Sequence, residues 1–113
     1  NSCVLPAGFS CYGYVIRDAG VLEISIGQAT GSDVNITGMA CDEDTAGLDW
    51  ETPNVVVRSG KYANITTAPT CYTLLGTPAE GDFYRGTLYI NYTDTRTLIR
   101  HNIKGDISYK VES

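Results

Sequence analysis

The last third of the chain, residues 82–111, constrains the fold most, because its side chains alternate between apolar and polar over an unusual length. From residue 99 to residue 111, every odd position is apolar or His101, except Gly105, and every even position is polar. Leu88, Ile90 and Tyr92 show the same alternation before a short polar turn. A period of two predicts one long β-hairpin. Such a hairpin buries one face only if the preceding residues supply a second sheet.

Those preceding residues divide into short alternating or apolar segments separated by turn residues. We expect strands at 12–17, 21–27, 34–40, 55–58 and 62–67, and a further short strand at 72–75. All four prolines fall between these segments, where they remove no ladder hydrogen bond. About seven or eight strands without helical periodicity predict an all-β sandwich, one domain over residues 1–113. We expect the three strands between Tyr12 and Ala40 to face the hairpin, and residues 1–10 to form a loop or a leading strand.

Cysteine usage indicates disulfides rather than a metal site. The chain has four cysteines and one histidine and contains no CxxC motif, so zinc is not expected. An even number of cysteines in a small β-rich chain is typical of an oxidising, extracellular compartment. Four cysteines allow three pairings; we favour Cys3–Cys11 with Cys41–Cys71. No apolar run approaches the ~20 residues that span a bilayer, and the first residue, Asn1, suggests a processed or trimmed product.

Three Asn-x-Thr triplets are candidate N-glycosylation sites, at Asn35, Asn64 and Asn91. In each expected strand the asparagine is in phase opposite to the core-facing residues. We therefore predict a chain displayed outside the cell that carries N-linked glycans. The alternative is that asparagine and threonine only fill exposed strand faces.

Charge is distributed unevenly along the chain. The net charge is −5, which argues against nucleic acid and anionic lipid as partners. Residues 1–57 carry eight acids and one base, whereas residues 58–113 carry five acids and seven bases. This asymmetry is either accidental or the mark of a subunit with an acidic side and a basic side, suited to head-to-tail contact with its own copies.

Little in the sequence indicates catalysis or a cofactor. His101 lies in phase with the core face, the cysteines are expected to be oxidised, and no serine has a nucleophile-elbow context. We predict no catalytic residue, no enzyme activity and no cofactor. Asp42, Glu43 and Asp44 are a weak calcium candidate, because carboxylates are calcium ligands, but the spacing is not that of the twelve-residue calcium loop. The alternative is a solvated acidic loop, with Trp50 as a core plug beneath it or an interface anchor; we favour the plug.

Eight tyrosines are many for this length, and several must lie on outer faces. Surface aromatic rows occur in carbohydrate-binding sheets and in subunit interfaces, although tyrosine also suits exposed strands for its β-propensity alone. A surface row drawn from Tyr12, Tyr14, Tyr84 and Tyr89 would form the contact of a secreted module that binds carbohydrate or protein.

Five stretches resemble the extracellular β-domain of archaeal type IV pilin-like and archaellin-like filament subunits. They are Cys3-x-Leu5-Pro6-x-Gly8-Phe9-x-Cys11, residues 20–26 (GVLEISI), residues 34–41 (VNITGMAC), residues 81–92 (GDFYRGTLYINY) and His101-x-Ile103-x-Gly105-x-Ile107.

The resemblance implies an immunoglobulin-like sandwich on a pilus-like cell-surface filament, often N-glycosylated, with roles in adhesion or motility. It also implies copies of the same chain as partners and no enzyme activity. One departure matters, because such subunits begin with a long apolar helix and residues 1–113 contain none. Either that helix was removed or lies outside these residues, or the filament assembles otherwise. One alternative is donor-strand exchange, with residues 1–10 or 106–113 as the donor strand. The alternative function is a secreted carbohydrate- or protein-binding β-sandwich module.

Overall fold

The computed structural model of the chain describes residues 1–43 and 47–113. Within these residues the fold is all-β, as the alternation predicts, with nine strands, one 3₁₀ turn and no α-helix. No described helix is long and apolar enough to cross a membrane. The strands are β1 (Ser2–Val4), β2 (Phe9–Arg17), β3 (Val21–Gln28), β4 (Val34–Asp42), β5 (Val55–Val57), β6 (Lys61–Asn64), β7 (Cys71–Tyr72), β8 (Phe83–Asp94) and β9 (Arg100–Lys110), with the 3₁₀ turn at Asp18–Gly20.

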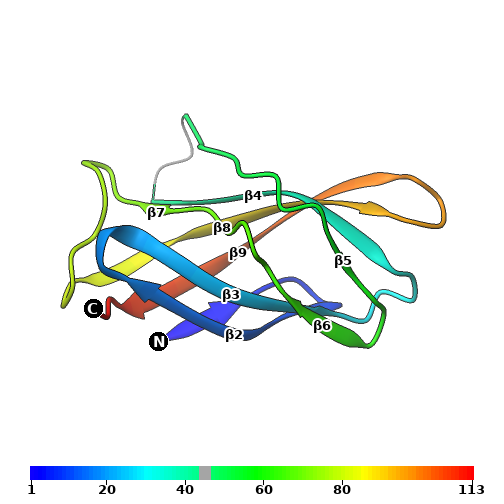
Figure 1. The fold of residues 1–113 in the computed structure, drawn as a ribbon, viewed down its shortest axis with the longest axis horizontal. Coiled ribbons are helices and arrows are strands. Elements are labelled where there is room, and N and C mark those ends of the chain that lie inside the picture. Colours follow the sequence, from blue (N-terminus) through cyan, green and yellow to red (C-terminus); the bar gives the residue numbers. More distant parts are fainter. Residues whose placement is uncertain (44–46) are drawn as a thin grey trace.

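Two sheets form the layers of the sandwich (Figure 1). The larger sheet has the order β1-β9-β8-β4-β5, and β7 pairs with β4 in parallel at the end of that strand. The smaller sheet has the order β2-β3-β6. The predicted hairpin is confirmed as β8 and β9, which pair in antiparallel register from Phe83↔Lys110 to Thr93↔Arg100.

The expectation that the three strands between Tyr12 and Ala40 share one sheet is wrong. β2 and β3 do pair, but β4 crosses to the larger sheet and pairs with β8. Alternation fixes which side chains face inward and does not fix which strand is the neighbour. The buried Gln28 side chain stabilises the crossing: its Nε2 donates to the carbonyl oxygens of Ser32 (2.8 Å) and Val57 (2.9 Å). Its Oε1 accepts from the backbone amide and the hydroxyl of Thr30.

The core lies between the sheets and draws on both. It is built from inward-facing aliphatic side chains at alternate positions of the long strands, so it follows the predicted period. Fully buried members include Ile16 and Ile26 of the smaller sheet, and Ile36, Met39, Leu88, Ile90 and Ile107 of the larger one.

The far half of the hairpin is not buried, although its inner face keeps the same alternation. Ile99 is 56% exposed and His101 is exposed, so the expectation that they belong to the core is wrong. The reason is geometric: the hairpin extends past the end of the smaller sheet (Figure 1). There the inner face is covered only in part, by Phe9, whose ring lies 4.9 Å from that of Tyr92.

Both favoured disulfides are confirmed, Cys3–Cys11 and Cys41–Cys71. The first joins β1 to β2 and so links the two sheets covalently at one side of the sandwich. The second joins β4 to β7, with a Cα–Cα distance of 4.5 Å. Residues 1–10, predicted as a loop or leading strand, contain β1, which pairs with β9 of the same chain.

Candidate functional site

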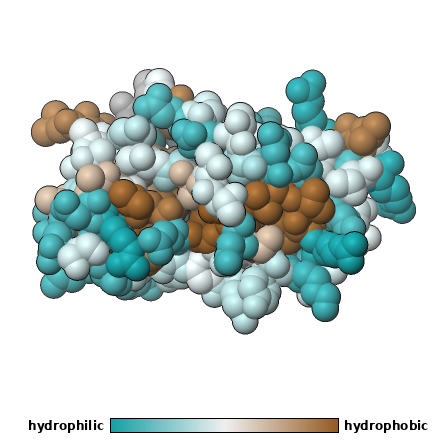
Figure 2. All heavy atoms as spheres, viewed as in Figure 1, coloured by the Kyte–Doolittle hydropathy of each residue, from teal (hydrophilic) through white to brown (hydrophobic). Residues whose placement is uncertain are grey.

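Two ends of the molecule present apolar side chains to solvent, and together they form the candidate site. The domain is elongated, with extents of 41 × 26 × 22 Å. The turn between β8 and β9 lies at one end of the long axis, and the loop between β7 and β8 lies at the other (Figure 1). We call residues 94–101 the tip and residues 73–82 the base. Figure 2 shows hydrophobic atoms at both ends of this face, and further hydrophobic patches along its middle among largely hydrophilic atoms.

The tip is a rigid turn. The Asp94 carboxylate accepts hydrogen bonds from the backbone amides of Arg96 (2.8 Å) and Thr97 (3.1 Å). These two bonds hold the pKa of Asp94 below its usual value. Thr95 attaches the turn to the rest of the domain, because its amide and its hydroxyl both donate to the carbonyl oxygen of Asp33. The turn therefore has little freedom to withdraw its side chains.

Two apolar residues project from this turn. Leu98 is 75% exposed and Ile99 is 56% exposed. Leu98 has a φ of +63°, a left-handed conformation that disfavours a large L-residue by about 1–2 kcal/mol and suits glycine. Behind them the ring of Tyr92 stacks on His101, with centroids 4.9 Å apart and planes 17° apart. An exposed leucine held in a strained conformation is a candidate contact residue.

The base is also attached firmly. Its first residues follow β7, which is bonded to β4 by the Cys41–Cys71 disulfide and by parallel pairing. Thr73 and Gly76 then close a turn through backbone hydrogen bonds of 2.7 and 3.4 Å. Between these two residues, Leu74 is 68% exposed and Leu75 is fully exposed.

The two ends differ in charge. The base contains Glu80 and Asp82. Asp18 lies beside it, since its carboxylate accepts a hydrogen bond from the backbone amide of Glu80. Glu43 also lies nearby, since its backbone amide donates to the carbonyl oxygen of Tyr72, next to the base. All four side chains are exposed. Arg85 and Lys110, on β8 and β9, flank this end and balance part of that charge.

The tip carries the opposite bias. Arg96 and Arg100 are exposed there, as are Arg58, which follows β5, and Lys61, which begins the neighbouring strand β6. The two carboxylates of this end, Asp33 and Asp94, are half-buried and accept from backbone amides. The two ends thus differ in charge along the long axis, but not as the two halves of the sequence do, since Glu80 and Asp82 of the base belong to residues 58–113.

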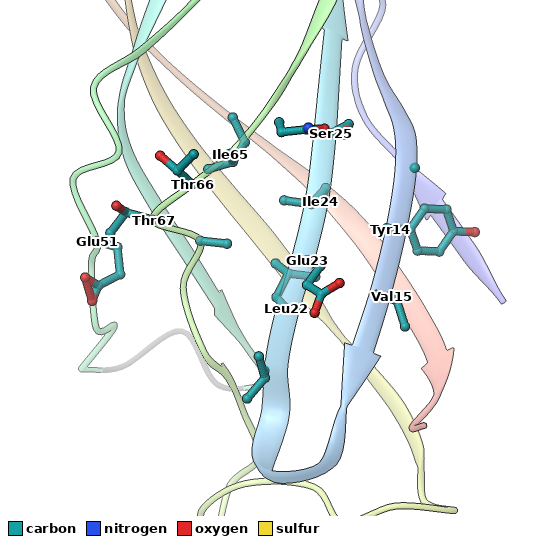
Figure 3. Close-up of a pocket in the computed structure, with 14 residues that line it drawn as sticks. Tyr14, Val15, Leu22, Glu23, Ile24, Ser25, Glu51, Ile65, Thr66 and Thr67 are labelled. Carbon is teal, nitrogen blue, oxygen red and sulfur yellow. Dashed lines mark hydrogen bonds between the residues drawn. The ribbon is translucent and has the colours of Figure 1, made fainter. Parts of the chain in front are cut away.

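A groove of about 830 Å³ opens beside β3, between β2 and residues 64–68 (Figure 3). Several of its polar groups already have partners: the Ser25 hydroxyl donates to Asn64 Oδ1 within the groove, and Glu23 forms an ion pair of 2.9 Å with Arg17, which lies outside its lining. Glu51 lies on the side of residues 64–68. No histidine, cysteine or lysine lines this groove among the described residues, so nothing there pairs a hydroxyl with a general base of those types.

The weak calcium candidate is only partly within the described residues. Asp42 is 8% exposed and ends β4, whereas Glu43 is exposed and Asp44 lies outside the described residues. No group of three or more histidine, cysteine or carboxylate side chains among the described residues is arranged to hold a metal ion. The negative charges of Asp42 and Glu43 act instead on Tyr84, whose pKa is raised mainly by burial and further by these neighbours.

The tyrosine row is not one surface. Tyr84 is 1% exposed, so its assignment to the surface is wrong, and Tyr14 faces inward against Tyr109, with ring centroids 5.7 Å apart. Tyr12 lies on the outer face of the smaller sheet, stacked on Tyr62 with centroids 3.8 Å apart. Tyr89 is in the other sheet and contacts Trp50 edge to face.

Trp50 is not a core plug. It is 42% exposed and lies over the outer face of the larger sheet, where a β-carbon added at Gly38 would be 3.3 Å from Trp50 Cε3. A tryptophan can pack there because Gly38 leaves the sheet surface open. The same glycine position is also covered by Asn91, whose Nδ2 would be 3.3 Å from that β-carbon.

The three candidate glycan acceptors differ in exposure. Asn64 is exposed at the end of the edge strand β6. Asn35 and Asn91 are half-buried on the larger sheet, and Asn35 Oδ1 is buried without a hydrogen-bond partner. Sequence reasoning missed the two leucines of the base and the conformation of Leu98. Adjacent leucines in a loop punctuated by glycine and proline, at residues 74–78, were the available signal.

Comparison of the chain with models of protein families, with curated proteins and with solved structures finds no match.

Proposed function

We propose that this domain is a structural subunit of an extracellular, cell-surface filament, and that it assembles with copies of itself. The observation that supports this best is the exposure of apolar side chains at opposite ends of an elongated domain, Leu98 and Ile99 at the tip and Leu74 and Leu75 at the base. Exposed apolar surface is often a site of protein–protein contact. Two such sites at opposite ends let each subunit contact two neighbours, which a filament requires.

The extracellular location is supported by the two disulfides, since such bonds persist in oxidising compartments. Exposed Asn64 would place N-linked carbohydrate on the side of the sandwich, away from the tip. Adhesion or motility is then the role that such a filament would serve.

Donor-strand exchange is less compatible with this geometry than end-to-end contact. β1 already pairs with β9 of its own chain, and Cys3 is bonded to Cys11. Residues 106–110 belong to β9, which lies between β1 and β8. Donation of either segment to another copy would break strand pairing that already exists within the chain.

Sedimentation velocity of the purified domain from micromolar to millimolar concentration tests the proposal, together with negative-stain imaging of material from the natural source. We expect reversible association that grows beyond a dimer, and filaments in the native material. A monomer at every concentration, with no filament in the native material, would reject it.

A second candidate is a secreted carbohydrate- or protein-binding module, and the stacked pair of Tyr12 and Tyr62 favours it. The two residues are 64% and 54% exposed and border a groove of about 430 Å³ that Lys61 and Ser10 also line. Exposed aromatic rings with nearby polar groups suit sugar binding. Binding of the monomer on a glycan array, lost in Tyr62→Ala and kept in Val56→Thr, would support this function over the first.

A further inference from the structure

The chemistry of the two ends indicates which surfaces meet in the proposed assembly. We propose that the contact is heterologous: the tip of one copy binds the base of the next copy. The tip contributes Leu98, Ile99, Arg96 and Arg100, and the base contributes Leu74 and Leu75 with the negatively charged side chains around them. This inference rests on the proposed function and specifies its interface. It gives the assembly a direction, because every subunit then points the same way.

The conformation of Leu98 is the first reason. Glycine would fit the turn at a φ of +63° without strain, yet the position holds a large apolar residue that is 75% exposed and therefore gains little from its own core. Its side chain is best explained by a surface that covers it. The turn that holds it is fixed by the Asp94 and Thr95 hydrogen bonds, so binding would require little ordering of the chain.

Charge decides which surface covers the tip. A tip-to-tip contact would bring Arg96 and Arg100 of both copies together, and a base-to-base contact would do the same for Glu80 and Asp82. Like charges that face each other across an interface are unfavourable, whereas opposite charges favour association and fix its register. Contact between a tip and a base pairs the arginines with the carboxylates and places apolar residues on both sides of one interface.

The size of the ends sets the expected strength. The two short extents, 26 and 22 Å, limit the contact at either end to at most about 570 Å² on each partner, which is below the area of a standard interface. One end-to-end contact is therefore weak and sensitive to concentration and salt. Each added subunit would lengthen the assembly by about the long extent, 41 Å.

Two single-end variants test the inference. Leu98→Gly removes the tip side chain and relieves the strained backbone, so we expect unchanged or higher thermal stability with association weakened about tenfold or more. A variant that carries Leu74→Ser and Leu75→Ser removes the apolar residues of the base. Val4→Thr is the control, because Val4 is 62% exposed on β1 and pairs with Asp106 of β9, between the two ends.

Mixing the two variants distinguishes the geometries. Each retains one intact end, so a heterologous contact predicts that neither variant grows alone and that a mixture forms a 1:1 dimer that does not extend. Arg96→Glu combined with Arg100→Glu should weaken association of the otherwise unchanged chain. Raising the salt concentration should also weaken the association of the unmodified chain.

The outcomes separate this inference from the proposed function. If the unmodified chain stays monomeric and the native material contains no filament, the proposed function fails and this inference fails with it. If the unmodified chain associates but Leu98→Gly alone still dimerises through its base, the contact is symmetric and the inference is wrong. Association that neither single-end variant weakens would also reject the inference while leaving the proposed function standing.

Discussion

The Tyr84 hydroxyl donates a hydrogen bond of 2.8 Å to the backbone carbonyl oxygen of Tyr72, and this bond joins the start of β8 to β7. Tyr84 is buried, and its hydroxyl also lies 3.7 Å from Cys41 Sγ. The ring can occupy this place because the next inward-facing residue is Gly86, where a β-carbon would be 2.5 Å from the Tyr84 hydroxyl. Together with the Cys41–Cys71 disulfide, the bond fixes the root of the base.

Replacing Tyr84 by phenylalanine should destabilise the domain by about 1–2 kcal/mol at neutral pH, because the carbonyl of Tyr72 loses its buried donor. Burial raises the pKa of Tyr84, and the charges of Asp42 and Glu43 raise it further. The neutral phenol is thus favoured in the folded state, so its contribution is complete below about pH 10 and is lost as pH rises above that value. Urea denaturation at pH 7 and at alkaline pH measures both effects.

The difference in the free energy of unfolding between the unmodified chain and Tyr84→Phe should therefore shrink as the pH rises above about 10. Tyr12→Phe is the control, since that ring is exposed. A stability difference that stays constant across alkaline pH would contradict the role given to burial.

Gly105→Ala should disrupt the attachment of β1. A β-carbon at position 105 would lie 2.2 Å from the carbonyl oxygen of Val4 and 2.7 Å from Leu5 Cδ2. The Val4 oxygen belongs to the backbone, so it can make room only if β1 moves. We expect a loss of about 1–3 kcal/mol, as for other overpacked sites, and faster amide exchange in Ser2–Val4. Gly13→Ala is the matched control, because its β-carbon would meet nothing within 4 Å. Equal effects of the two substitutions would refute the close approach as the cause.

The two disulfides should contribute unequally. Cys41 and Cys71 are 30 residues apart and fully buried, whereas Cys3 and Cys11 are 8 residues apart and half-buried. In the chain-entropy description the longer loop stabilises by about 3.7 kcal/mol and the shorter one by about 2.5 kcal/mol. The test replaces both cysteines of one pair at a time by alanine and measures unfolding without reductant. It shows which disulfide contributes more to stability. A larger loss for the Cys3–Cys11 pair would show that joining the two sheets matters more than loop length.

The sequence predicted the strands well and their arrangement only in part. Alternation located β2, β3, β4, β8 and β9 within a few residues, because a half-buried strand needs that period. It did not reveal that β4 leaves the smaller sheet, since alternation does not specify the neighbouring strand and the buried Gln28 side chain that stabilises the crossing bonds Val57, which is 29 residues away, as well as nearby Ser32. Both disulfides match the pairing favoured among the three possible ones, although the sequence alone did not determine it.

Exposure along the hairpin was harder to predict than strand position. Ile99, just before β9, and Ile107 within it share one phase of the alternation, yet the first is 56% exposed and the second 1% exposed. The difference arises because the smaller sheet ends before the hairpin does, and the period carries no information about the length of the opposite layer. Gly105 reads as an interruption of the pattern, whereas the structure shows it as the point where residues 4 and 5 pass closely.

Among the three candidate glycan acceptors, we expect carbohydrate on Asn64. Its side chain is exposed on an edge strand, and Thr66 of the same triplet is exposed as well. Asn91 lies on β8 between two neighbouring strands, packed towards Gly38, and Asn35 has its side-chain oxygen buried. A transferase that acts on the folded domain reaches only the first of these freely.

Mass spectrometry of peptides from the native protein, before and after enzymatic deglycosylation, measures occupancy at each asparagine. Asn64→Gln should remove most of the added mass, while Asn91→Gln should leave it nearly unchanged. Carbohydrate on Asn91 with Asn64 bare would mean that the sugar is added before β8 pairs with its neighbours. It would then lie beside Trp50 on the outer face of the larger sheet, where it would cover the ring that the folded domain now exposes.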